Sequence, residues 1–130
     1  MRRLRTTASR WAAVACLAIA LLYLVRVVDA PSAAYLLGEI VMGVLGVAAA
    51  VKMWLHNCFE SHLAAGALVA ATSGGTLLAV TAGLPGGGAS GLTPTRVALL
   101  ALSAAVVVLL VQDGRVRREH ARRARRPYAR

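Results

Sequence analysis

Two charged side chains inside apolar sequence are the residues best placed to do chemistry in this chain. Arg26 stands near the end of one apolar run, and Glu39 stands about one helical turn into the next. A charge buried in lipid costs roughly 3 kcal/mol or more unless it is paired or reaches the interface. Counted from the turn between the two runs, both residues lie at similar depth, which predicts an Arg26–Glu39 ion pair. Asp29, three residues after Arg26, is the alternative partner.

Such a pair could relay protons or ions, or it could hold two helices together. A conduction pathway should carry further ionisable residues at mid-membrane depth, and the two later apolar runs have none there. The pattern therefore favours a clamp between two helices.

A second group of chemically capable residues lies in one short polar segment, 56–62. It carries four types of metal ligand at alternate positions: His56, Cys58, Glu60 and His62. Structural zinc sites usually combine a short ligand pair with a second pair held elsewhere, and no second cluster is present in the sequence. Trp54 and Phe59 flank the segment as interfacial aromatic residues would. We therefore interpret the segment as a polar connector at headgroup level and expect no metal site.

The sequence motifs of the common enzyme classes are missing. There is no phosphate-binding loop, zinc-protease helix, nucleophile elbow or paired-carboxylate arrangement. The glycine-rich segment 83–91 has no basic partner that would make it a phosphate cradle. We expect a protein that is not an enzyme and needs no cofactor.

The elements that must position these residues follow from composition. The 130 residues are 58% hydrophobic and only 15% charged, whereas soluble domains are about a quarter charged. Four apolar segments of 17 to 22 residues make helices of roughly 26 to 33 Å, which matches a hydrocarbon core of about 30 Å. The sequence predicts an all-α membrane protein with four transmembrane helices in two antiparallel hairpins. The predicted spans are 11–28, 35–54, 63–84 and 96–112, within one transmembrane domain, 11–112. Three spans with one peripheral helix are the alternative.

The connectors carry helix-start residues at two places. Ser32 is placed to cap the second span, and Thr93 followed by Pro94 is typical of the start of the fourth.

The distribution of basic residues predicts the orientation. Thirteen of the fifteen lie in the N-tail 1–10, at Lys52 or in the C-tail 113–130, and only Arg26 and Arg96 lie on the other side. This bias predicts cytoplasmic termini and a multi-pass protein of the cytoplasmic (inner) membrane. A cleaved signal peptide is a competing interpretation of the first span, but that span is long for one.

The C-tail is predicted to contact anionic lipid headgroups, where each basic residue contributes about 1 kcal/mol. It could also continue the fourth helix. No aromatic platform accompanies the charge, which argues against a nucleic-acid partner. The predicted lipid-contacting residues are Arg115, Arg117, Arg118, Arg122, Arg123, Arg125 and Arg126.

Small residues recur at helical spacing on the third span, and less densely on the second. In membranes, such ridges let helix backbones approach closely. They could pack the four helices together, or they could drive association with further copies or with other membrane subunits. The predicted packing residues are Ala67, Ala71, Gly75, Ala79 and Gly83 on the third span, and Gly43 and Gly46 on the second.

The basic tail 115–130 and the third-span ridge together give the chain a plan that resembles that of the phage holins. The resemblance implies a homo-oligomer that permeabilises the inner membrane, with the ridge setting assembly and the tail regulating it. A non-catalytic accessory or scaffold subunit of a larger membrane complex is the alternative function, and a small-solute transporter is the third.

Overall fold

The computed structural model describes residues 7–56, 59–82 and 91–124. The helices in these ranges are α1 (Thr7–Arg26), a short 3-10 turn η1 (Val27–Asp29), α2 (Ala33–Leu55), α3 (Phe59–Thr81) and α4 (Pro94–Ala124). Each of the four α-helices is long and apolar enough to cross a membrane. The predicted all-α, four-span membrane protein is therefore confirmed at this level.

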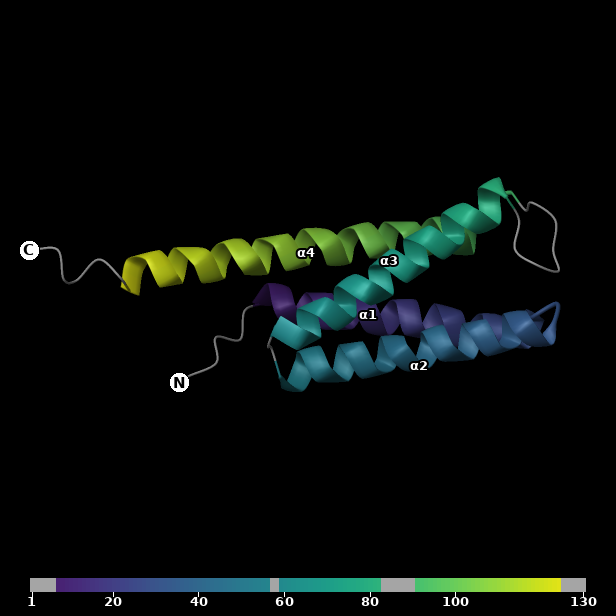
Figure 1. The fold of residues 1–130 in the computed structure, drawn as a ribbon, viewed down its shortest axis with the longest axis horizontal. Helices are drawn as coiled ribbons and strands as arrows, with labels where there is room; N and C mark the ends of the chain where they lie inside the picture. The colour runs from purple at the N-terminus through teal and green to yellow at the C-terminus, as the bar shows by residue number, and fades with distance from the viewer. Residues whose placement is uncertain (1–6, 57–58, 83–90, 125–130) are drawn as a thin grey trace, which may run out of the picture.

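The four helices pair in the order expected of two hairpins. α1 lies against α2 and α4, while α3 crosses obliquely and contacts α4 and α2 (Figure 1). We call the end of the bundle that carries η1 and the start of α4 the turn end. The opposite end, where α1 starts and α2 passes to α3, is the terminal end. Towards the turn end, α3 diverges from the α1–α2 hairpin.

Two predicted helix starts are confirmed. The Ser32 hydroxyl accepts a hydrogen bond from the Tyr35 backbone N–H at 3.4 Å, which caps α2. The Thr93 hydroxyl accepts one from the Arg96 N–H at 3.4 Å, and Pro94 is the first residue of α4.

The connector before α3 is shorter than predicted. α3 begins at Phe59, so Glu60, Ser61 and His62 belong to its first turn. An acidic residue there interacts favourably with the helix dipole, and Lys52 Nζ on α2 lies 2.8 Å from Glu60 Oε2. α3 also ends earlier than expected, at Thr81.

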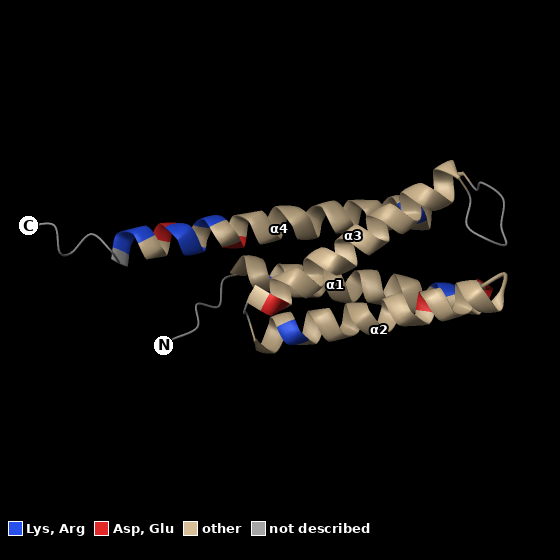
Figure 2. Cartoon of the chain, viewed as in Figure 1, with Lys and Arg blue, Asp and Glu red and all other residues tan. Residues whose placement is uncertain are grey.

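α4 is much longer than a membrane span. Its 31 residues run to Ala124, so that the helix is about 46 Å long and continues into the basic tail. Figure 2 shows the arginines of this extension beyond the terminal end, whereas the middle of the bundle is almost free of charge.

The interior is rich in alanine, with Ile19, Met53 and Leu99 as its largest fully buried side chains. α1 contributes the most buried positions, among them Ala12, Cys16, Ile19 and Ala20. Large apolar side chains such as Leu37 and Val44 point outward, as expected for a surface that faces lipid. Close packing of helices stabilises such a bundle, because the hydrophobic effect does not drive helices together within lipid.

Candidate functional site

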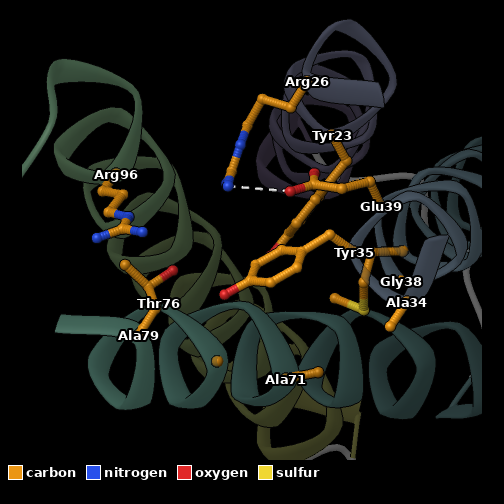
Figure 3. Close-up of a pocket in the computed structure, with 12 residues that line it drawn as sticks. Tyr23, Arg26, Ala34, Tyr35, Gly38, Glu39, Ala71, Thr76, Ala79 and Arg96 are labelled. Carbon is orange, nitrogen blue, oxygen red and sulfur yellow. Dashed lines mark ion pairs between the residues drawn. The ribbon is translucent and has the colours of Figure 1, made fainter. Parts of the chain in front are cut away.

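A cavity of about 270 Å³ lies at the turn end, where α3 separates from the α1–α2 hairpin (Figure 3). All four helices contribute to it. Half of its lining is apolar: Ala34, Gly38, Met42, Ala71, Gly75 and Ala79. The other half is polar, and we call the cavity the polar cleft after these residues: Tyr23, Arg26, Tyr35, Glu39, Thr76 and Arg96.

An ion pair between α1 and α2 forms one wall of the polar cleft. Arg26 Nη2 lies 2.9 Å from Glu39 Oε1, and their side chains are 31% and 9% exposed. The second carboxylate oxygen, Glu39 Oε2, is buried without a hydrogen-bond partner among the described residues. The carboxylate is therefore only partly satisfied within the chain.

Arg96 stands across the polar cleft from this pair. It comes from the first turn of α4, and its Nη1 donates to the Gly91 carbonyl oxygen at 3.1 Å. The Tyr35 ring extends from α2 across the cleft towards Thr76, whose hydroxyl donates to the Thr72 carbonyl oxygen (Figure 3). Among the described residues that line it, the cleft thus holds two guanidinium groups and one carboxylate.

A second polar cluster lies at the terminal end, around Asp113 of α4. The Asp113 side chain is fully buried, and its Oδ2 accepts a hydrogen bond from Arg117 Nε at 2.7 Å. His62 Nε2, in the first turn of α3, lies 2.8 Å from the same oxygen. This Asp113 cluster joins α3 to α4 at the point where α4 leaves the bundle.

No contact of Asp113 is predicted from the sequence, where it is the first residue of the C-tail 113–130. The i, i+4 spacing to Arg117 could have indicated their pair, because such residues are neighbours on a helix surface. The contact with His62 joins residues 51 positions apart, and no local spacing reports it.

The predicted packing residues fall in three places. Gly43 and Gly46 face α1: a Cβ on Gly43 would lie 2.7 Å from Leu24 Cδ2, and one on Gly46 would lie 2.8 Å from Ala20 Cβ. Ala67 is exposed on α3. Ala71, Gly75 and Ala79 line the polar cleft, and Gly83 lies outside the described residues.

α3 also presents small residues on a surface that no other helix covers within residues 7–56, 59–82 and 91–124. Ala67 and Ala70 are exposed and Gly74 is half-buried; their i, i+3, i+7 spacing puts them on one side of the helix, whereas the neighbouring Ala71 lines the polar cleft. A Cβ on Gly74 would meet nothing within 4 Å. We call Ala67, Ala70 and Gly74 the α3 outer face.

The predicted lipid-contacting arginines lie mostly on the exposed surface of the α4 extension. Arg117 is half-buried against Asp113, and Arg125 and Arg126 lie outside the described residues. The exposed members are Arg115, Arg118, Arg122 and Arg123. Among the residues that the structure describes, no three His, Cys, Asp or Glu side chains are grouped to hold a metal ion.

We expect Arg26→Gln to lower the free energy of unfolding by about 2 kcal/mol, because it leaves the buried Glu39 carboxylate without its charged partner. The double variant Arg26→Gln/Glu39→Gln should recover most of this loss, since it removes both charges. Denaturant unfolding in detergent micelles measures both values. Arg118→Gln, at an exposed position of α4, is the matched control. Equal losses in the single and double variants would show that the pair contributes no coupling.

Comparisons with known proteins provide no family assignment: no protein-family model, curated protein or solved structure matches the chain.

Proposed function

We propose that this chain is a self-associating membrane protein whose assembled form permeabilises the bilayer in the manner of phage holins. The observation that carries the proposal is the α3 outer face, a stripe of small residues that the other described helices leave uncovered. Small residues at this spacing allow a second helix to approach closely, which is how transmembrane helices associate when lipid supplies no hydrophobic drive.

The α1–α2 contact indicates how small residues act when a second helix packs against them. Gly43 and Gly46 each stand directly against a side chain of α1, and the two helices pack tightly there. Gly74 on α3 likewise has no side chain, but a Cβ at this position would meet nothing within 4 Å. A helix from a second copy would complete this surface.

The α4 extension supports the same function. Its exposed arginines lie beyond the terminal end and would draw that end towards anionic headgroups, at about 1 kcal/mol each. The extension would thereby keep copies in one orientation, so that the same α3 surfaces meet in the plane of the membrane. With the terminal end in the cytoplasm, as the basic residues predict, the bilayer is the inner membrane.

Induced expression in a bacterial host should dissipate the membrane potential, as reported by a potential-sensitive dye. Ala67→Leu should weaken association at least about fivefold, because the added methylenes hold the approaching helices apart. Cross-linking in membranes should then yield fewer oligomers, and the loss of potential should be delayed. Ala48→Leu, the same substitution at an exposed position of α2, should leave both unchanged.

A host that keeps its potential and continues to grow, with the protein at wild-type levels in its membrane, would refute permeabilisation. Unchanged cross-linking of Ala67→Leu would refute the role of the α3 outer face. Purification in mild detergent that yields a stoichiometric foreign subunit in place of oligomers would favour an accessory subunit that docks through the same surface.

A further inference from the structure

The polar cleft contains a hydrogen-bond acceptor that the described residues leave unsatisfied. Glu39 points from α2 into the cleft, and its side chain is only 9% exposed (Figure 3). Arg26 Nη2 binds one carboxylate oxygen at 2.9 Å, whereas the other, Oε2, has no hydrogen-bond partner among the described residues. A buried polar atom without a hydrogen bond is costly, so a molecule that donates to Oε2 would be stabilised in the cleft.

The charges of the Arg26–Glu39 pair limit what that molecule can be. An ionised carboxylate only accepts hydrogen bonds, so the ligand must supply a donor. A carboxylate or a phosphodiester has acceptors alone and cannot do so. Because Arg26 already neutralises Glu39, a cation would bring an uncompensated charge into a membrane-spanning segment. A neutral donor remains, and the hydroxyl of an alcohol is the simplest that an apolar chain can carry.

The size and lining of the cleft favour a hydroxyl that is joined to an apolar chain. The cleft volume of about 270 Å³ is many times what one water molecule needs. Met42 on α2, with Ala71 and Ala79 on α3, forms an apolar wall that offers ordered water no hydrogen-bond partners. A chain of methylene groups would fill this volume and remove the apolar wall from water.

The cleft opens between α2 and α3. Gly38 on α2 and Ala71 on α3 line it and are exposed, while Gly75 is half-buried. A Cβ on Gly38 or on Gly75 would meet nothing within 4 Å, so the two helices leave open space there. Glu39 lies about 9 Å along α2 from its start, inside the hydrocarbon layer. A ligand of Glu39 therefore comes from the bilayer.

We propose that the polar cleft binds a neutral, membrane-soluble alcohol, whose hydroxyl donates to Glu39 Oε2 and whose apolar chain leaves towards the lipid between Gly38 and Gly75. The α3 outer face has no residue that lines the cleft, so the site stands apart from the proposed permeabilisation. A molecule with the same chain but no O–H would leave Oε2 unsatisfied and should bind more weakly.

The test uses the full chain in micelles of an amine-oxide detergent, which has no hydroxyl group. The probe is decanol with a photoreactive diazirine in its chain, and mass spectrometry locates the residues that it labels after illumination. We expect labels on α2 and α3 at residues that line the cleft. Unlabelled 1-decanol should compete with the probe. Decyl methyl ether, which lacks the O–H, should compete about tenfold less well, because the hydrogen bond to a charged acceptor is lost.

Gly75→Leu should abolish labelling of the cleft, because the new side chain occupies the open space while the Arg26–Glu39 pair stays in place. Gly66→Leu is the matched control: it is the same substitution on the same helix, at a position whose Cβ also meets nothing within 4 Å but which does not line the cleft. It should retain the labelling. Glu39→Gln should weaken competition by 1-decanol about tenfold and leave competition by the ether unchanged.

The Gly75 and Gly66 variants keep the test decisive even if Glu39→Gln fails to fold. Equal competition by 1-decanol and decyl methyl ether would overturn the role of Glu39, because the chain alone would then account for binding. Unchanged labelling in Gly75→Leu, or labels confined to residues outside the cleft, would overturn the site. Each of these outcomes is read in micelles and is the same whether or not the chain permeabilises a bilayer.

Discussion

Replacing Asp113 by alanine is expected to lower the free energy of unfolding by about 2–4 kcal/mol, the largest effect of any single charge in the chain. Asp113 is fully buried, and one of its oxygens contacts both His62 and Arg117. Without the carboxylate, two polar groups at the α3–α4 contact lose their shared acceptor. Both partners are partly exposed and can reach water, which keeps the loss below that of a fully enclosed pair.

Denaturant unfolding in micelles, followed by circular dichroism, measures this loss. Hydrogen exchange should also speed up at the start of α3 and along α4 beyond Asp113, because the contact that joins them is gone. Glu119→Ala is the control: it removes an acidic side chain from the same helix at an exposed position. A stability change for Asp113→Ala no larger than that of Glu119→Ala would show that the Asp113 cluster does not hold the two helices together.

Gly46→Ala should destabilise the protein by about 1–3 kcal/mol, although alanine is the better helix former. The new methyl group would lie 2.8 Å from Ala20 Cβ and 3.2 Å from Ala20 Cα. The second of these atoms belongs to the backbone, so relief requires α1 and α2 to move apart along their tightest contact.

Gly66→Ala is the same substitution on a helix surface where the methyl group meets nothing within 4 Å. Here only the helix propensity remains, and we expect a gain of about 0.5–1 kcal/mol. The two variants should therefore shift the unfolding midpoint in opposite directions. A shift in the same direction would show that the α1–α2 distance is not limited at Gly46.

The four spans could be predicted because lipid imposes a length and a composition on any helix that crosses it. The two helix starts at Ser32 and Thr93 could be predicted because capping is local, involving a side chain and a backbone N–H three residues later. The Arg26–Glu39 pair in the polar wall of the cleft could be predicted for the same reason. Arg26 and Glu39 flank a short turn, so counting from that turn indicated that they face each other.

What could not be predicted depends on how helices distant in sequence cross. The small residues of α3 have one spacing, yet they divide between an uncovered surface at Ala67 and the polar cleft at Gly75. The oblique path of α3 produces this division, and nothing local encodes a crossing angle. For the same reason the sequence does not indicate that Arg96 and Glu39 line one cavity. Nor does it indicate that His62 contacts Asp113.

The continuity of α4 gives the chain a mechanical linkage. From Asp113 to Ala124 the helix projects about 17 Å past its contact with His62, without a break. A rigid rod held about two thirds of the way along works as a lever: a tilt of about 10° inside the membrane would swing the arginine-bearing tip by about 3 Å. The lever also works in reverse. Drawing the tip onto a charged surface would apply torque to the membrane-spanning part of α4, which begins at the rim of the polar cleft.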